Sequence, residues 1–451
     1  MSSTSGLSYT FSRGRGVSDA FAALQAVVAS RVPDEKDLVT LTWVKNHWKL
    51  ILWKVASYVR SRPDLLGDWW TFERVVEQLR YRYEREINRA ERSAIKRIQE
   101  RDSPASLPMV LCVSQVRWGD PPDEADNGSL VIVGLELTDG WYRIRTNVDA
   151  TLKRACERGK LVVGSKIAVS GAKLDSVTTD GVEVLQGLHS STLVISGNST
   201  SLAPWHATLG FRREPFVAGL SSLSPGGGLV PLVDVVIDRA FACGFIDLRR
   251  GRGTETWGED EERVRAEEWK AKLSDEAESG VTSEDQLVEL LRDAASALEP
   301  VGVDSGPSPY PDVEPDEVLD RLEGATASAR RSMVHRLSAA QVPAVLELAI
   351  ERARESRHRS VEDLQKELAD KYPPRDIRCF RMVRVGDARE TTKQPGRSAL
   401  LTVWDADKFG DGFFDVGTRY LISNLVPKGS WRPQDREVSL ATRRDSRWRK
   451  L

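Results

Sequence analysis

Aromatic and basic side chains occur together over residues 376–451, and this mixture suits the binding of a single nucleic-acid strand. Such strands bind when bases stack on aromatic rings beside a basic groove, at about 1–3 kcal/mol per base. In the segment SALLTVW, alternation places Leu401 and Val403 on one face and Trp404 on the other. Each aromatic residue taken singly could instead pack in a core, which is its commoner fate. The predicted contacts are Phe380, Arg381, Arg384, Trp404, Lys408, Arg419, Tyr420, Trp431, Arg443 and Arg444.

A second charged group lies along a helix predicted over residues 73–102. Apolar residues such as Val76 and Leu79 share one face, and arginines cover much of the remainder. Glutamates interleave with these arginines, so a solvated, ion-paired face is one interpretation. The other is a groove for an acidic partner, whose carboxylates need arginines and whose aromatic side chains need apolar slots. The residues of this predicted partner surface are Trp43, Trp48, Trp53, Arg80, Arg85, Arg89, Arg92, Arg97 and Trp141.

No group of residues fits the roles of nucleophile, base and stabiliser that an enzyme needs. The 5 histidines are scattered, and none has the spacing of a metal-ligand motif. The 4 cysteines are far apart and form no CxxC pair, which fits a reducing compartment. We therefore expect a non-enzymatic protein with no catalytic residues, no metal and no cofactor.

Charge and hydropathy further limit the kinds of protein that this sequence could encode. The net charge is -2, so any nucleic-acid site must be a local basic patch. No apolar run reaches the roughly 18 residues of a membrane span, and the N-terminal residues lack the apolar core of a signal peptide. We expect an intracellular protein that does not enter a membrane.

Hydrophobic periodicity divides the chain into segments, and the predicted fold class is α+β with several domains. Residues 1–35 are expected to be a flexible lead-in containing a short helix, and residues 229–249 a pair of strands. A Pro-, Gly- and Ser-rich loop over residues 300–315 interrupts the later helices. The predicted domains are a helical domain (36–105), a small β-barrel (106–214), a linker with the first strands of a second barrel (215–254), a helical insertion (255–375) and the rest of the second barrel (376–451).

Three runs carry a resemblance to a known family: LELTDGWYRIRTNVDATL (135–152), GKLVVGSKIAVSGAKL (159–174) and ISGNSTSLAPWHATLGF (195–211). They resemble the first OB-fold of the breast cancer type 2 susceptibility protein family. The runs WVKNHWKLILWKVASY (43–58) and ERVVEQLRYRYEREINRAERSAIKRIQERD (73–102) resemble the helical domain of the same family.

The resemblance implies a helical domain followed by two OB-fold barrels, the second interrupted by a tower-like helical insertion. It implies a nuclear scaffold of homologous recombination that binds single-stranded DNA and the small, acidic deleted-in-split-hand/foot protein. A RecA-like recombinase would be engaged through regions outside this chain. Two alternatives stay open: a protein-interaction platform with little intrinsic DNA binding, and a nucleic-acid enzyme with OB-fold appendages.

Overall fold

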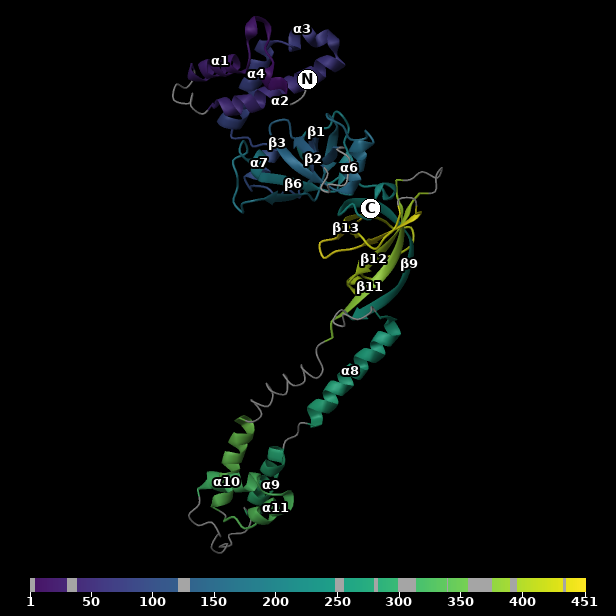
Figure 1. The fold of residues 1–451 in the computed structure, drawn as a ribbon. Helices are drawn as coiled ribbons and strands as arrows, with labels where there is room; N and C mark the ends of the chain where they lie inside the picture. Colours follow the sequence, from purple (N-terminus) through teal and green to yellow (C-terminus); the bar gives the residue numbers. More distant parts are fainter. Residues whose placement is uncertain are drawn as a thin grey trace. The chain divides into compact units, whose positions relative to one another are not determined.

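The computed structural model describes residues 5–30, 39–120, 130–247, 255–279, 283–298, 314–338, 340–355, 375–389, 396–432 and 435–451. They form two compact units (Figure 1). Unit 1 comprises residues 1–243 and 379–451, and unit 2 comprises residues 244–378. The predicted loop at 300–315 lies almost wholly outside the described residues.

Unit 1 begins with a helical domain built around α2 (Leu41–Ser61), which packs against α1 (Val17–Ala29) and α4 (Phe72–Tyr83). The Thr40 hydroxyl accepts a hydrogen bond from the backbone N–H of Trp43 and so begins α2. The chain turns after Ser61 through η4 (Pro63–Leu65) and α3 (Leu66–Trp69), since proline cannot continue the helical ladder. The core of the domain contains Trp48, which is fully buried.

The predicted flexible lead-in is wrong for the described residues 5–30. Two 3-10 turns, η1 (Ser5–Ser8) and η2 (Ser12–Gly14), precede α1. Phe11 and Leu24 are buried in the core of the helical domain, and the Trp48 indole donates to the Gly6 carbonyl at 3.1 Å. The polar composition of residues 1–35 led to the prediction of flexibility, because only a few apolar residues in this segment provide the packing.

The helix predicted over residues 73–102 is broken in its middle. Helix α4 ends at Tyr83 and passes into a π-helical turn, η5 (Glu84–Asn88), and Ala90 then has a φ of 52°. A new helix, α5 (Ala94–Gln99), starts where the Ser93 hydroxyl caps the N–H of Lys96. Apolar periodicity runs through this break because α4 faces the helical domain, whereas Ile95 and Ile98 of α5 pack in the core of the first sheet.

The first sheet is mixed, with strand order β5-β6-β3-β2-β1-β4-β7 and β8 paired to β1. Strand β1 pairs antiparallel with β2 and β4, and β3 pairs parallel with β6. Leu111, Leu137 and Ile167, from three different strands, all lie in the core of this sheet. The elements are β1 (Met109–Gly119), β2 (Val131–Thr138), β3 (Arg143–Val148), α6 (Ala150–Glu157), β4 (Lys166–Val169), β5 (Lys173–Ser176), α7 (Gly187–Ser190), β6 (Ser191–Ile195), β7 (Thr200–Leu202) and β8 (Gly210–Phe211).

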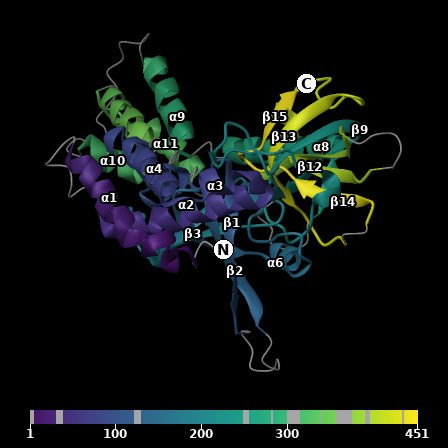
Figure 2. The same ribbon diagram turned by 90° about the horizontal axis from the view of Figure 1, so that it is seen from above.

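The ends of β1 and β2 extend beyond the rest of this sheet as a hairpin arm (Figure 2). Trp118 lies on this arm, with 54% of its surface exposed. Register shifts after Val113 and Arg117 are β-bulges, which bend and twist such arms.

The second sheet pairs strands far apart in the sequence, after η6 (Leu220–Ser222). Strand β9 (Val230–Asp247) is one long strand, and not the predicted pair, because its residues pair continuously with neighbouring strands and make no hairpin turn. The order is β10-β9-β11-β12-β14-β13-β15, and β9 also pairs with β13, so that five strands close into a ring. The remaining elements are β11 (Ile377–Asp387), β12 (Ser398–Trp404), η7 (Ala406–Lys408), β13 (Arg419–Pro427), β14 (Glu437–Ala441) and β15 (Arg447–Lys450).

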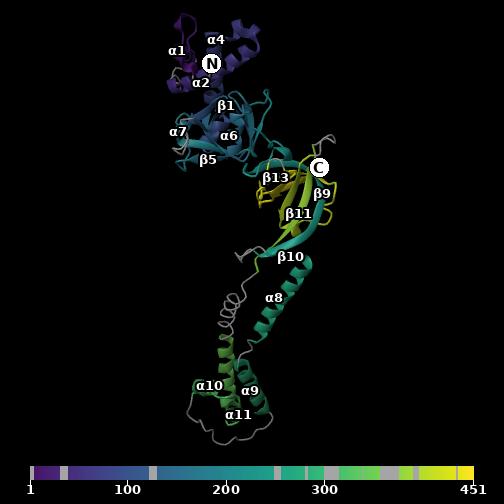
Figure 3. The ribbon, with the colours of Figure 1, turned by 45° about the vertical axis from the view of Figure 1, so that its right-hand side comes forward.

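Unit 2 contains the helices of the insertion (Figure 3). Strand β10 (Thr256–Gly258) leads into α8 (Glu259–Ser279), where the Trp257 indole donates to Glu262 at 2.7 Å. A separate apolar core joins α9 (Ser283–Leu298), α10 (Pro315–Glu323), α11 (Ala327–Val334) and the helical residues 341–355.

Candidate nucleic-acid and partner-binding surfaces

An aromatic pair lies on the outer face of the second sheet, where β11 and β12 run side by side. Phe380 is directly opposite Trp404 in the strand register, and their ring centroids are 5.8 Å apart. Leu401 and Val403 are fully buried on the inner face, as the alternation predicted, and Trp404 remains half-buried. Two predicted contacts therefore meet and form a small aromatic platform.

A lysine that the sequence analysis did not select completes this platform. The Lys428 ammonium lies 5.7 Å from the centroid of the Trp404 ring and donates to the Thr402 hydroxyl at 3.3 Å. Met382 pairs with Thr402 across the same face. Lys428 was missed because it follows β13 in the sequence, and only the pairing of β13 with β14 brings it near β12. We define the platform as Phe380, Met382, Thr402, Trp404 and Lys428.

Two predicted stacking residues are inside the protein and are corrected here. Tyr420 is 1% exposed, and its hydroxyl donates to the Phe413 carbonyl at 2.6 Å. Trp431 is 8% exposed beneath the guanidinium of Arg397, 4.8 Å from its ring centroid. Neither ring is free to stack with a base, because each is covered by neighbouring side chains.

Most of the predicted cations are already paired. Arg419 binds both carboxylate oxygens of Asp234 on the neighbouring β9, at 2.9 and 2.6 Å. Arg381 donates to the Phe241 carbonyl at 2.6 Å. Arg384, Lys408 and Arg443 pair respectively with Glu437 at 2.7 Å, Asp405 at 3.0 Å and Asp445 at 3.0 Å. Arg444 is exposed, and its side chain makes no ion pair within the described residues. The basic edge expected from the sequence is thus largely neutralised.

The predicted partner surface loses two of its tryptophans to the core of the helical domain. Trp48 is fully buried, and Trp43 is 5% exposed with its indole N–H donating to Glu86. Trp53 and Trp141 are half-buried. Tryptophan at regular helical spacing fills the helix interfaces here, which is the usual role of such residues.

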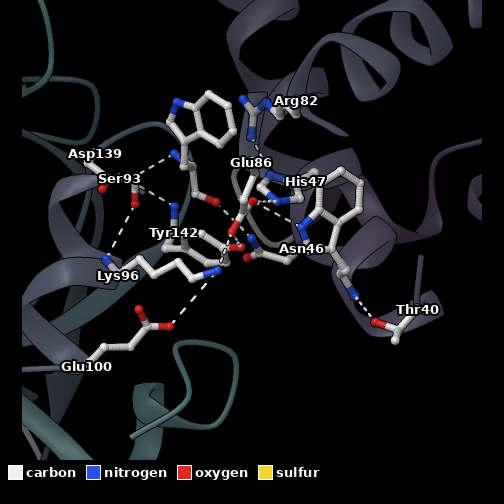
Figure 4. A network of polar contacts seen from close by, with 12 residues as sticks. Thr40, Asn46, His47, Arg82, Glu86, Ser93, Lys96, Glu100, Asp139 and Tyr142 are labelled. Atoms are coloured by element: carbon white, nitrogen blue, oxygen red, sulfur yellow. Dashed lines mark hydrogen bonds and ion pairs between the residues drawn. The ribbon is translucent and has the colours of Figure 1, made fainter. Parts of the chain in front are cut away.

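Through its hydrogen bond to Glu86, Trp43 belongs to a buried polar network between the helical domain and the first sheet. Figure 4 shows Glu86, His47, Arg82, Lys96 and Tyr142 of this network close together. Glu86, carried inward by the π-helical turn, accepts hydrogen bonds from Trp43, Lys96 and Tyr142. Asn46 donates to the Trp141 carbonyl at 2.8 Å. The Asp139 carboxylate accepts from the backbone N–H of Ile95 at 2.8 Å.

The ionisable groups of this network have pKa values shifted from their usual ones. Burial lowers the pKa of His47 to about 4. Burial would raise the pKa of the Glu86 carboxyl, but contacts with His47, Lys96 and Tyr142 hold it at about 2. Burial also lowers the pKa of Arg82 to about 10, which leaves it charged at neutral pH. Its guanidinium lies 5.3 Å from the ring centroid of Trp141.

The arginines predicted to contact the partner fall into two groups in the structure, those whose side chains have partners among the described residues and those whose side chains do not. Arg85 pairs with Glu91 and donates to the Tyr81 hydroxyl, and it lies 5.8 Å from the centroid of Trp141. Arg92 pairs with Asp102 and Glu100, and Arg97 lies over Phe211. Arg80 and Arg89 are exposed, and their side chains have no ion pair in the described part of the chain. The ion-paired interpretation therefore holds for Arg85 and Arg92, and Arg80 and Arg89 remain candidates for contact with an acidic partner.

Other classes of site find no support in the described residues. No three His, Cys, Asp or Glu residues gather there in a way that could hold a metal ion. No described helix combines the length and apolar character needed to cross a membrane.

The architecture of the N-terminal half defines a class of protein. A helical domain shares buried polar contacts with a sheet in which β1, β2 and β3 form a meander and β3 runs parallel to β6, the arrangement of an OB-fold. Family models match these same two parts: "BRCA2, helical" over residues 21–90 and "BRCA2, oligonucleotide/oligosaccharide-binding, domain 1" over residues 93–213.

Similar proteins agree with these matches. The chain is 39% identical over 206 residues to "Protein BREAST CANCER SUSCEPTIBILITY 2 homolog A" of Arabidopsis thaliana, and 40% identical over 208 residues to homolog B. Each alignment covers 44% of this chain and 18% of the relative. Residues 21–90 and 93–213 are thus similar to the helical domain and first OB-fold of the breast cancer type 2 susceptibility protein family, and the chain spans less than a fifth of the length of these relatives.

Proposed function

We propose that the chain is a non-enzymatic scaffold of homologous-recombination repair that binds single-stranded DNA through the platform on its second sheet. The observation that carries this proposal is the Phe380–Trp404 pair with Lys428 beside it. Stacking on such rings is tolerant of sequence, since every base has a π-face, and the lysine supplies a contact for phosphate.

The second sheet is proposed to be a second OB-fold, because its pairings repeat those of the first. In each sheet the first strand pairs antiparallel with a later strand, as β1 does with β4 and β9 with β13. In each, the third strand runs parallel to the last strand of the motif, as β3 does with β6 and β12 with β14. On this view residues 255–375 are the tower-like insertion between its first and second strands.

The DNA proposal is tested with Trp404→Ala, measured by fluorescence anisotropy on a labelled single-stranded oligonucleotide. Loss of one stacked base should weaken binding about 5- to 150-fold. The control is Trp118→Ala, which removes an exposed tryptophan from the hairpin arm of the first sheet. Thermal unfolding of both variants establishes that they fold. If folded Trp404→Ala protein binds as tightly as wild type while Trp118→Ala or Trp141→Ala binds more weakly, DNA lies elsewhere.

Lys428→Gln tests the phosphate contact separately. Removing one contact to a single strand should flatten the dependence of log affinity on log salt concentration by about 0.7. Arg384→Gln is the matched comparison, because Arg384 already pairs with Glu437 at 2.7 Å. If log affinity depends equally on log salt concentration in Lys428→Gln and in wild type, Lys428 does not contact the DNA phosphates.

The helical domain is proposed to bind the small, acidic deleted-in-split-hand/foot protein through Arg80 and Arg89. These two guanidiniums can pair with carboxylates of a partner without first leaving an internal ion pair. The double reversal Arg80→Glu/Arg89→Glu should weaken binding of that protein, and more so at low salt, where charges are least screened. Arg92→Glu, at an arginine with internal partners, should weaken it less. An unchanged affinity in the double variant would show that this face is only solvated.

The alternative function is a protein-interaction platform with little intrinsic DNA affinity. The pairing of Arg419 with Asp234 and of Arg384 with Glu437 favours it, since these cations are not available to phosphates. Binding of the acidic partner together with no measurable DNA affinity at low salt would support this alternative. Nuclear localisation and delivery of a RecA-like recombinase, through regions outside this chain, complete the proposal.

A further inference from the structure

Two of the four cysteines face each other on neighbouring strands of unit 1. Cys243 is on β9 and Cys379 is on β11, and these strands are adjacent in the second sheet. The Cys243 side chain is near enough to the Cys379 thiol to affect its pKa. The chain leaves unit 1 after Cys243 and returns to it at Cys379. The two cysteines therefore flank the insertion.

Contacts along the two strands agree with this pairing. The backbone N–H of Ala388 donates to the Asp234 carbonyl at 2.9 Å, and Arg381 reaches the Phe241 carbonyl. Counting equal steps along both strands from either contact places Cys379 opposite Cys243. Because hydrogen-bonded and non-hydrogen-bonded pairs alternate, the cysteines fall at a non-hydrogen-bonded pair, where Cα atoms are about 4.5 Å apart. A disulfide needs a Cα separation of roughly 4.4–6.8 Å.

We propose that Cys243 and Cys379 are an oxidisable pair that forms a reversible disulfide across the root of the insertion. In a reducing compartment both remain thiols, and such pairs act there as transient redox-sensitive bonds. The proposal does not depend on DNA binding. It adds a modification site that would join the two ends of residues 244–378 covalently.

Hydrogen peroxide is the oxidant in the proposed reaction. Cys243, which is half-exposed, attacks one peroxide oxygen and becomes a sulfenic acid, with release of water. The buried Cys379 then attacks the Cys243 sulfur, and the S–OH oxygen leaves as a second water. Two thiols are oxidised and one peroxide is reduced, so atoms and electrons balance. Burial raises the pKa of Cys379 to about 11, and ring closure should therefore be faster at pH 9 than at pH 7.

The experiment treats the folded full chain with hydrogen peroxide, blocks free thiols with an alkylating reagent and maps tryptic peptides without reduction. The expected product links residues 240–249 to residues 379–381, is about 2 Da lighter than the two peptides together and disappears on reduction. The Cys112→Ser/Cys156→Ser variant should form this link, because it keeps the pair. Cys243→Ser, at a half-exposed position, should not form it.

Two further results decide the proposal. Oxidised wild type should unfold at a higher temperature than reduced wild type, since a cross-link restrains the unfolded chain, and Cys243→Ser should show no such difference. Oxidation of Cys243 to sulfinic acid in the folded protein without any linked peptide would overturn the proposal. So would a link that forms only after the chain is denatured.

Discussion

The protonation of His47 is determined by the side chains that enclose it. Arg82 donates to its Nδ1 at 2.7 Å, and since a guanidinium can only donate, Nδ1 accepts and the ring proton lies on Nε2. Nε2 is 3.4 Å from a Glu86 oxygen. A neutral imidazole thus lies between a buried cation and a buried carboxylate, where a second positive charge would be costly.

Acid should destabilise the folded chain through this histidine. The pKa of His47 is about 4 when folded and 6.5 ordinarily, so below pH 6.5 the unfolded chain binds more protons and stability falls as pH falls towards 4. His47→Gln should reduce the loss of unfolding free energy between pH 7.5 and pH 5 by about 2 kcal/mol. The measurement is urea unfolding at both pH values, with His189→Gln, at an exposed position, as the control. The same pH dependence in wild type and His47→Gln would contradict the assignment.

At the scale of elements, strand β2 depends on a glycine that permits close approach to β3. A Cβ added at Gly134 would lie 2.4 Å from the Thr146 carbonyl oxygen, which is backbone and cannot easily move. Glycine inside a strand normally weakens it, and here it is required because a neighbouring backbone is so near.

Gly134→Ala should therefore lower the free energy of unfolding by about 1–3 kcal/mol, through strain in the sheet. Gly226→Ala is the matched control, because nothing lies within 4 Å of the added Cβ. Chemical denaturation followed by tryptophan fluorescence measures both variants. A Gly134→Ala protein as stable as the control would mean that β2 and β3 separate at little cost.

Over the whole of unit 1, contacts tie the helical domain to the first sheet. Asn46 of α2 donates to the Trp141 carbonyl at 2.8 Å, and α5, which follows the helical domain, is fixed to the sheet because Gln99 donates to the Ser191 hydroxyl of β6 at 3.0 Å. The connection between the two parts is itself packed, since Ser103 and Ala105 are buried. These contacts make independent motion of the two parts costly.

Limited trypsin digestion should accordingly spare Arg101, whose guanidinium also donates to the Thr178 carbonyl at 3.2 Å. Cleavage at exposed arginines of unit 2, such as Arg263, should come first. Mass spectrometry of early fragments identifies the cleaved bonds. Early cleavage after Arg101 would show that the helical domain and the first sheet open independently.

The amino-acid sequence by itself determined the order of helical and strand segments, because burial imposes period 2 or 3.6 on apolar residues. It determined that Leu401 and Val403 face inward, and its runs over residues 43–102 and 135–211 carried the resemblance to the two domains that the family models match. These features depend on residues that are close together in the chain, so the local pattern of apolar and polar residues is enough to predict them.

The tertiary structure decided which polar and aromatic residues remain available. Arg419 is neutralised by Asp234, which is distant in sequence and adjacent only through the pairing of β9 with β13. Trp48 and Tyr420 are enclosed by neighbours, whereas Lys428 is brought to Trp404. Strand pairing places residues side by side that no local period relates, so the free energy of each charge and ring depends on partners that periodicity cannot identify.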